Sequence, residues 1–250
     1  GYSYVCVSVS GKGGVGKTVT TLNIAASLHD IDENVLVVDG DLSNPTVGLY
    51  LGLYQFPNTF NQVLESNASP HEALYIHQTG LRIIPASISL NNLETDVSDM
   101  GKVFEQLDGH TLIDCPPGFG REVQSIVRNC DEVVAVTNPI SPAVIGCMRL
   151  VEMARDMGKP VKGIVLNNLT YQEVDSEEIE AICNAPILGE VPRDSNVDYS
   201  IEKRMPLVKD SPYAPASLSF KEIAHKLIDK EYSKPLFPSF QRFVDKISKL

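Results

Sequence analysis

Several features that define common protein classes are absent from this sequence of 250 residues. It has no tryptophan. Its five cysteines are odd in number, lie 15 or more residues apart and never form a Cys-x-x-Cys pair, which argues against a disulfide framework and a structural zinc site. No stretch of eighteen uncharged apolar residues is present, so no segment is predicted to span a membrane. Acidic residues outnumber basic ones by 32 to 21 and give a net charge of −11, which disfavours DNA binding through overall charge.

The composition that remains is typical of a folded cytoplasmic protein. Apolar residues make up 43% of the chain, which is enough for a sizeable core and too many for a disordered chain. No basic and apolar pattern at the start of the sequence indicates a secretory signal. Cysteines at this spacing are expected to be small buried side chains in a reducing compartment. We expect one α/β domain, or at most two small ones, in the cytoplasm.

Short β-branched runs alternate with longer helical stretches along the chain, and this order predicts a mostly parallel sheet with helices on both faces. Residues 35–38 are apolar throughout, as expected for a strand that is covered on both faces. The predicted strands are 4–10, 34–39, 81–85, 111–115, 132–137, 162–167 and 187–191. The predicted helices are 18–29, 91–107, 121–130, 143–157, 176–183 and 218–232, with a helical turn at 60–65.

A glycine-rich segment between the first predicted strand and the first predicted helix carries the most specific signal. It reads Gly11-Lys12-Gly13-Gly14-Val15-Gly16-Lys17-Thr18, which fits the pattern and the strand–loop–helix context of a P-loop. Backbone N–H groups of the loop and the helix N-terminus can bind the β-phosphate. Lys17 can reach the β- and γ-phosphates, and the Thr18 hydroxyl can ligate Mg²⁺. The sequence therefore predicts a three-layer P-loop NTPase fold that binds ATP or ADP with Mg²⁺.

Lys12 is an additional lysine that the ordinary P-loop pattern does not contain. With it, Lys-Gly-Gly-Val-Gly-Lys-Thr closely resembles the deviant Walker A motif of the MinD/ParA family of ATPases, and the resemblance extends from Tyr4 to about Tyr232. It implies a homodimer with ATP between the subunits, in which Lys12 reaches the partner's nucleotide as an arginine finger does. It also implies slow hydrolysis of ATP. The implied nucleotide-binding residues of the loop are Gly13, Gly14, Val15, Gly16, Lys17, Thr18 and Val19.

Carboxylates end two of the predicted strands, where open α/β sheets place their ligands. Residues 35–38 lead into Asp39 and Asp41, which near a triphosphate can serve Mg²⁺ hydration and orientation of the attacking water. In the resembled family, the residue that matches Asp41 positions the water, and Asp39 supports the metal site. The resemblance thus implies that Lys12, Lys17 and Asp41 are catalytic.

The other carboxylate follows the apolar run Leu112-Ile113, where Asp114 begins the segment Asp-Cys-Pro-Pro-Gly. This segment resembles Walker B followed by switch II. The resemblance implies that Asp114 holds Mg²⁺ together with Thr18 and Asp39, and that the Gly118 N–H senses the γ-phosphate. The MinD branch usually has Ala where this chain has Pro117, which departs toward the iron–sulfur carrier branch of the superfamily.

Two later strand ends match positions that hold adenine in MinD-like proteins. Asn167 ends one strand, and Pro192, Arg193 and Asp194 follow the next. In the family, Asn and Asp side chains and backbone groups at these positions contact the base. The family often has Arg after the Asn, whereas this chain has Asn168, so one contact is lost or replaced. From the residues alone, simple turns at the strand ends explain these positions as well.

The last segment differs in charge from the rest of the chain. From Tyr232 onward, four basic residues face one acidic residue, a local charge of +3, which leaves −14 for residues 1–231. Apolar side chains at 240, 243, 244, 247 and 250 fall within an arc of about 120° on a helix, which is typical of an interfacial amphipathic helix. We predict an ATPase domain at 1–231 and a linker with a basic amphipathic helix at 232–250. The alternative is a last helix packed on the domain's own surface.

These observations favour a switch ATPase of the MinD type that positions cell machinery, such as the division site or polar structures. The predicted partners are a second copy of the chain, an anionic membrane contacted by residues 238–250 at the inner face of the cell membrane, and an unknown activating or cargo protein. A DNA partition ATPase of the ParA type is an alternative that the acidic composition disfavours. A metal or iron–sulfur carrier of the Mrp type is a second alternative, and it lacks the expected Cys-x-x-Cys pair.

Overall fold

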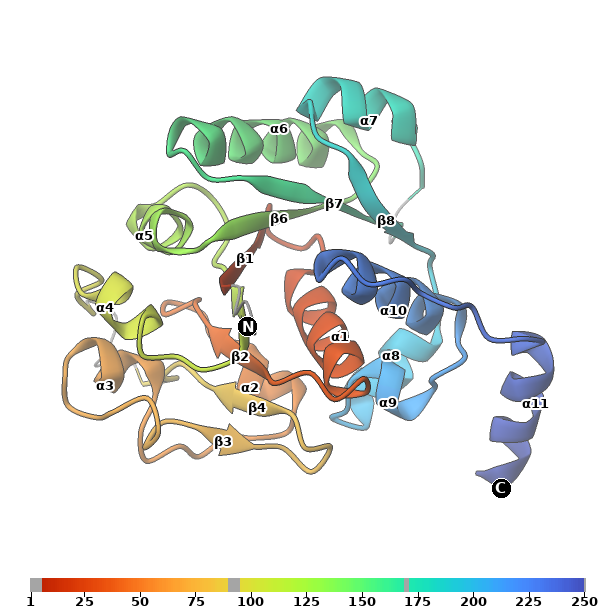
Figure 1. Ribbon diagram of the computed structural model, residues 1–250, viewed down its shortest axis with the longest axis horizontal. Helices are drawn as coiled ribbons and strands as arrows, with labels where there is room; N and C mark the ends of the chain where they lie inside the picture. The colour runs from red at the N-terminus through yellow and green to blue at the C-terminus, as the bar shows by residue number, and fades with distance from the viewer. Residues whose placement is uncertain (1–5, 90–94, 169–170, 250) are drawn as a thin grey trace.

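The structure, a computed structural model, describes residues 6–89, 95–168 and 171–249. Within these ranges an eight-stranded sheet has the order β3-β4-β2-β5-β1-β6-β7-β8 (Figure 1). Only β3 runs antiparallel to its neighbour, so the predicted mostly parallel sheet is confirmed. The strands are β1 (Cys6–Gly11), β2 (Val35–Asp39), β3 (Tyr75–Ile76), β4 (Arg82–Ile84), β5 (His110–Asp114), β6 (Glu132–Thr137), β7 (Val161–Asn167) and β8 (Ile187–Val191).

Helices cover both faces of this sheet and complete a three-layer α/β fold (Figure 1). Helices α1, α8, α9 and α10 lie on one side, and α3 to α7 lie on the other. Their bounds are α1 (Lys17–His29), α2 (Val47–Tyr50), α3 (Phe60–Leu64), α4 (Met100–Phe104), α5 (Arg121–Asn129), α6 (Ser141–Asp156), α7 (Ser176–Cys183), α8 (Asn196–Glu202), α9 (Leu207–Asp210), α10 (Pro215–Leu227) and α11 (Pro238–Ser248).

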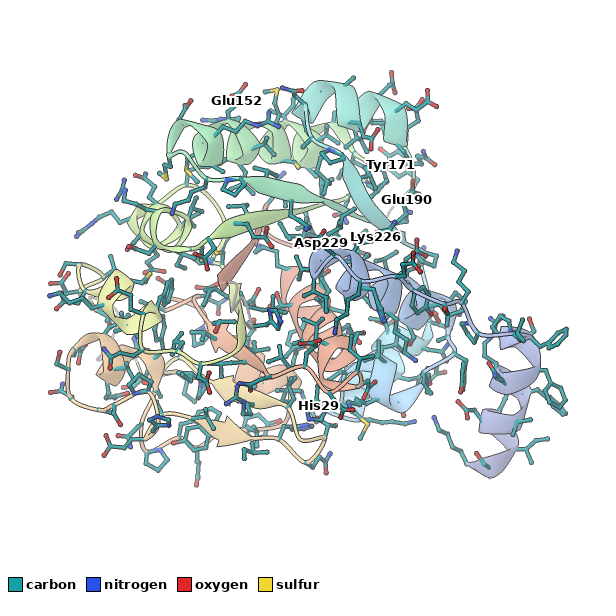
Figure 2. The ribbon with its side chains drawn as sticks, in the orientation of Figure 1. His29, Glu152, Tyr171, Glu190, Lys226 and Asp229 are labelled. Atoms are coloured by element: carbon teal, nitrogen blue, oxygen red, sulfur yellow. The ribbon has the colours of Figure 1, made fainter. Side chains whose placement is uncertain are left out.

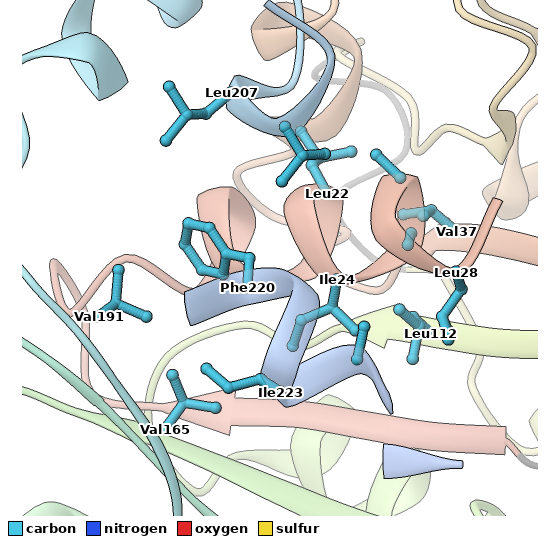
Figure 3. Packing of buried hydrophobic residues seen from close by; sticks show 14 of the residues in the cluster. Leu22, Ile24, Leu28, Val37, Leu112, Val165, Val191, Leu207, Phe220 and Ile223 are labelled. Atoms are coloured by element: carbon cyan, nitrogen blue, oxygen red, sulfur yellow. The ribbon is translucent and has the colours of Figure 1, made fainter. Parts of the chain in front are cut away.

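The apolar run in β2 shows why the sheet needs a helical layer on each side. Val35 and Val37 belong to the core that α1 and α10 cover, whereas Leu36 and Val38 belong to the core under α3, α4 and α5. Successive side chains of a strand point to opposite faces. Figure 3 shows the first of these cores, where Ile24 of α1 and Phe220 of α10 pack over the sheet. A strand that is apolar on both faces is therefore central, as the sequence predicts.

Polar contacts fix α10 at the edge of this core. Lys226 donates to the backbone oxygen of Leu188 at 3.1 Å, and Lys162 of β7 pairs with Asp229 at 2.7 Å. Figure 2 shows Lys226 and Asp229 side by side next to β7 and β8. These contacts join the end of α10 to the far edge of the sheet.

Two predicted helices have different bounds in the structure. The helix predicted at 91–107 is wrong for residues 95–99 and 105–107, because only Met100–Phe104 is helical, and residues 91–94 lie outside the described residues. Ser98 donates its backbone N–H to the Asp96 side chain at 3.0 Å, and such a local bond competes with a helix. The helix predicted at 218–232 begins earlier, at Pro215, a residue favoured in the first turn. It ends at Leu227, and Asp229 adopts a positive φ of 55°.

Short elements were not predicted from the sequence. They are β3, α2, α8 and α9, the longest of which has 7 residues. The turn predicted at 60–65 is helix α3. The part of the first predicted strand that precedes Cys6 lies outside the described residues.

Helix α11 lies at the right-hand edge of the molecule in Figure 1, joined to α10 by an extended linker. None of its residues is buried. The side chains of Phe240, Phe243, Val244 and Ile247, here called the apolar stripe, are 48% to 66% exposed. Among the described residues, no helix has the length and apolar character needed to cross a membrane.

Candidate functional site

A cavity of about 590 Å³ opens at the carboxyl ends of β1, β2 and β5. Strand β1 lies between β5 and β6, at the point where the strand order reverses, and open α/β sheets bind ligands at such points. Three segments line the cavity: the phosphate loop at 13–18, the loop after β2 at 41–50, and the segment after β5 at 114–123. The sheet therefore brings together the P-loop, Asp41 and Asp114, which are far apart in the sequence.

The phosphate loop depends on glycine at defined positions. Gly14 and Gly16 have φ values of 80° and 91°, which residues with a Cβ atom rarely adopt. Gly16 immediately precedes α1, so the positive end of this helix faces the cavity. Lys17 is 9% exposed and donates to the backbone oxygen of Lys12 at 3.0 Å. Burial lowers the pKa of its ammonium group, while the Asp114 carboxylate acts in the opposite direction.

Three oxygen atoms converge beside the loop. Thr18 Oγ1 donates to Asp114 Oδ2 at 2.6 Å and lies 2.9 Å from the hydroxyl of Thr46. A carboxylate and two hydroxyls are hard oxygen donors of the kind Mg²⁺ prefers, usually with several waters retained. These side chains fit a magnesium ion. The sequence identified Thr18 and Asp114, whereas Thr46 carried no signal.

Asp39 lies beside Asp114 in neighbouring strands, but its carboxylate accepts hydrogen bonds from the backbone. It accepts the N–H groups of Asp41, Thr46 and Val47, each at 3.1 Å, and it does not line the cavity. Burial and the nearby Asp114 charge raise its pKa well above the usual range. In this arrangement Asp39 holds the loop at 41–47. Its prediction as a direct part of the magnesium site stays a prediction.

Asp41 and Glu122 both line the cavity, and Glu122 is a residue that sequence reasoning missed. Ser43 Oγ donates to Glu122 Oε1 at 3.2 Å, and the backbone N–H of Leu42 also donates to this carboxylate. Burial raises the pKa of Glu122 and of Asp41. Glu122 thus ties the loop that carries Asp41 to the start of α5.

Lys12 is exposed and lies outside the phosphate cavity of its own chain. It lines a separate small cavity of about 60 Å³ with Gly118 and Phe119, next to Gly146 of α6. Gly118 has a positive φ of 86°, which turns the chain sharply after Asp114. Lys12 and Gly118, to which the resemblance assigns roles at the partner's nucleotide and at the γ-phosphate, therefore line the same small cavity.

The residues predicted to contact adenine are not among those that line the phosphate cavity. Asn167 donates its side-chain amide to the Val15 backbone oxygen at 3.0 Å, and Asn138 donates to the Asn167 oxygen at 2.8 Å. The Asp194 carboxylate accepts the backbone N–H of Ala216 at 3.1 Å. Asn167 thus connects β7 to the phosphate loop. Adenine contacts by Asn167, Pro192, Arg193 and Asp194 stay predictions.

Asp114 gives the site a testable dependence on pH. Burial raises its pKa to about 6 from the usual 3.8, so the folded chain keeps a proton that the unfolded chain releases between these values. The contribution of protonated Asp114 to the free energy of unfolding is therefore fully present below about pH 4 and is lost as the pH rises through about 6. Asp114→Asn is expected to raise the melting temperature of the protein without nucleotide or Mg²⁺ by a few degrees near pH 7.5. Near pH 4 the effect should be small.

Thermal unfolding followed by circular dichroism at the two pH values measures this difference. Each variant is compared with wild type at the same pH. An equal loss of stability at both values would show that Asp114 has an ordinary folded pKa and would contradict the account.

Comparisons with known proteins agree with the geometry. The ParA family model, described as NUBPL iron-transfer P-loop NTPase, matches residues 2–228. An uncharacterized ATP-binding protein of Methanocaldococcus jannaschii is 32% identical over 222 residues, which are 86% of this chain and 84% of the relative. The septum site-determining protein MinD of Synechocystis is 30% identical over 89% of this chain and 88% of the relative.

A similar solved structure is MinD of Pyrococcus horikoshii complexed with Mg-ADP. It has a TM-score of 0.84 and 27% identity, and the match covers 90% of this chain and 96% of that chain. The predicted fold and the resemblance to MinD are thereby confirmed. This chain belongs to the ParA family of P-loop NTPases and has the fold of MinD.

Proposed function

We propose that this protein is an ATP-dependent switch of the MinD type. It binds Mg·ATP as a monomer, forms a homodimer with ATP between the subunits, and hydrolyses the ATP slowly. The dimer attaches to an anionic membrane and positions cell machinery there. The observation that carries this proposal is the site at β1, β2 and β5, where the P-loop and the Thr18–Asp114 pair line one cavity and Lys12 is exposed outside it.

ATP or ADP with Mg²⁺ are the cofactors of this site. The backbone of residues 13–18 binds the phosphates at the start of α1, and Lys17 supplies a positive charge close to them. Thr18 and Asp114 provide oxygens for Mg²⁺, which neutralises negative charge on the phosphates. Asp41 lines the same cavity and orients the attacking water.

Lys12 supports the dimer part of the proposal. It is exposed at the rim and does not reach into the phosphate cavity of its own chain. A second chain that covers the rim would receive this cation at its own nucleotide, where it stabilises charge that develops on the transferred phosphate. Hydrolysis then requires two chains.

The tail supports the membrane part. Its apolar stripe is exposed, which supports contact with a membrane over the alternative of a last helix packed on the domain's own surface. Basic residues flank the stripe, as in helices that lie at a membrane surface. One short helix binds weakly, whereas two helices on one dimer raise avidity by roughly 10²–10⁴. Dimerisation on ATP thereby leads to membrane binding.

A carrier function of the Mrp type is the second candidate, because the family model is described by an iron-transfer protein and Pro117 departs toward that branch. This sequence has no Cys-x-x-Cys pair. A DNA partition function is supported only by membership of the same family. The charge of −14 on residues 1–231 disfavours DNA binding. The switch therefore ranks first.

Lys12→Ala tests the contribution of the second chain. The variant should bind ATP, because Lys17 and the loop backbone remain, but its turnover should fall by at least about tenfold because a transition-state cation is lost. Lys17→Ala serves as the comparison and should lose nucleotide binding or dimerisation. Phosphate release and fluorescent-nucleotide titration provide the two readouts. Hydrolysis by Lys12→Ala at the wild-type rate would contradict the mechanism in trans.

Glu122→Ala tests the connection between the loop at 41–46 and α5. Loss of both acceptor bonds frees the loop that carries Asp41, so kcat should fall about tenfold while KM changes little. Glu122→Gln keeps an acceptor oxygen and should recover part of the rate. Glu105→Ala removes an exposed carboxylate outside the cavity and is the control. Steady-state kinetics with a raised KM and an unchanged kcat would contradict this role.

Truncation after Tyr232 tests the tail. ATP hydrolysis should stay near normal, because none of residues 233–249 is buried, while sedimentation with anionic vesicles in Mg·ATP should be lost. Phe243→Glu should have the same effect, whereas Ser248→Glu adds the same charge outside the apolar stripe and should retain most binding. An unfolded or inactive truncated protein would show that the tail is part of the ATPase core and would contradict its proposed role in membrane binding. Equal binding with ATP and ADP would contradict the switch.

A further inference from the structure

An arginine lines the phosphate cavity where helix α5 begins. Arg121 is the first residue of α5, and it belongs to the lining of the cavity of about 590 Å³. It is exposed. The lining has one other cation, Lys17, against three carboxylates, those of Asp41, Asp114 and Glu122. The proposed switch gives Arg121 no role.

Arg121 has no ion pair with any residue in the part of the chain that the structure describes. Its charge does act on Asp96. Hydrogen bonds from Ser98 lower the pKa of the Asp96 carboxyl, and the charge of Arg121 acts in the same direction. Asp96 is exposed and already accepts the backbone N–H of Ser98 at 3.0 Å. The guanidinium thus lines the cavity without a carboxylate at ion-pair distance.

The stability of α5 does not explain a cation at this position. The helix dipole disfavours a cation in the first turn, whereas it favours an acidic residue there, such as Glu122. Gly120 precedes the helix and provides no side-chain cap. Residues 120–123 all line the cavity, so the positive end of α5 meets it. Arg121 adds a full charge to that end, and such a place attracts an anion.

The start of α5 also holds the loop that carries Asp41. Ser43 of this loop donates to Glu122 at 3.2 Å, and Glu122 is the neighbour of Arg121 in the sequence. Successive residues of a helix lie about 100° apart, so these two side chains leave α5 in different directions. In the proposed function Asp41 orients the water that attacks the γ-phosphate. Arg121 therefore lies close to the place where the γ-phosphate reacts.

We propose that Arg121 binds the γ-phosphate of the ATP held by its own chain and stabilises the charge on its oxygens during hydrolysis. This inference rests on the proposed hydrolysis of ATP. It adds a cation in cis to the partner's Lys12, because Arg121 lines the cavity of its own chain and Lys12 does not. A guanidinium can form paired bonds to phosphate oxygens.

The reaction determines when this contact matters. The oxygen of a water molecule bonds to the γ-phosphorus, and the bond from this phosphorus to the bridging oxygen breaks. The bridging oxygen keeps the electron pair and leaves with ADP, while the water releases one proton to solvent. A cation whose contact strengthens as charge develops on the transferred group raises kcat. ADP has no γ-phosphate, so its binding does not depend on Arg121.

Arg121→Ala in the full chain tests the contact. Its kcat should fall at least about tenfold, while its affinity for Mg·ADP should stay within about twofold of wild type. Its affinity for Mg·ADP with aluminium fluoride, which mimics the transferred phosphoryl group, should fall at least about tenfold. Arg121→Lys keeps the charge without the paired bonds and should recover part of both losses.

Arg128→Ala is the matched control, because Arg128 is an exposed arginine of the same helix that lies outside the cavity lining. It should behave like wild type in all three measurements. Melting temperatures show whether each variant is folded. If folded Arg121→Ala or Arg121→Lys binds the aluminium fluoride complex as tightly as Arg128→Ala, the proposal is overturned.

Asp96→Asn separates a contact with phosphate from a structural role of the interaction between Arg121 and Asp96. Arg121 is kept in this variant, so kcat and affinity for the aluminium fluoride complex should stay near those of wild type. Equal losses in Asp96→Asn and Arg121→Ala would show that Arg121 acts through Asp96 and would overturn the proposal.

Mixing Lys12→Ala with Arg121→Ala tests which chain the arginine serves. In a mixed dimer, the site on the Lys12→Ala chain has its own Arg121 and receives the partner's intact Lys12. This site is complete, so an equal mixture should regain about a quarter of the wild-type rate, since random pairing makes about half of the dimers mixed. Two different affinity tags verify that mixed dimers form. No gain in rate with verified mixed dimers would overturn the assignment in cis.

The proposed function fails in a different way. If Lys12→Ala alone hydrolyses ATP at the wild-type rate, the mechanism in trans is wrong. The affinity of Arg121→Ala for the aluminium fluoride complex still decides whether Arg121 contacts the phosphate.

Discussion

The site depends on the burial of the Asp114 carboxylate at the end of β5. Beside it, in the neighbouring strand, lies Asp39, and Asp41 follows two residues later. Burial raises the pKa values of all three acids, and the charges of Asp114 and Asp41 further disfavour ionisation of Asp39, as the charge of Asp41 does for Asp114. Bonds from Thr18 to Asp114 and from the loop backbone to Asp39 offset part of this cost. The remaining need for positive charge is what Lys17 and a magnesium ion supply.

Charges of opposite sign are also divided between the body of the protein and its tail. The body is acidic, its one strongly basic segment is the tail, and the two meet through pairs of opposite charge such as Lys249 with Asp210. Because α11 docks through polar side chains, the apolar stripe stays exposed at the edge of the molecule. In the proposed switch, dimerisation completes both the nucleotide site, which needs Lys12 of a second chain, and the membrane contact of the tail, which is weak for one helix alone. This common requirement connects the two ends of the proposed mechanism.

The fold and the centre of the site were predictable from the sequence because they rest on local patterns. Continuous apolar runs such as residues 35–38 identified the central strands, and the phosphate loop is contiguous. Glu122 was not predictable, because its role comes from bonds to Leu42 and Ser43, about eighty positions away. Asn138 directly follows β6 and precedes a proline, so it could have been identified as an amide at a strand end. The helix predicted at 91–107 failed where Asp96 bonds its own backbone segment, which periodicity does not detect.

The central claim is that the γ-phosphate drives association of two chains, and the Asp41→Ala variant tests it most directly. Without the residue that orients water, bound ATP should persist, while the loop and metal ligands that bind it are unchanged. Light scattering after size exclusion measures the mass of this variant in Mg·ATP and in Mg·ADP. The account predicts a stable dimer with ATP and a monomer with ADP. A monomer with both nucleotides, under conditions where nucleotide binding is verified, would contradict it.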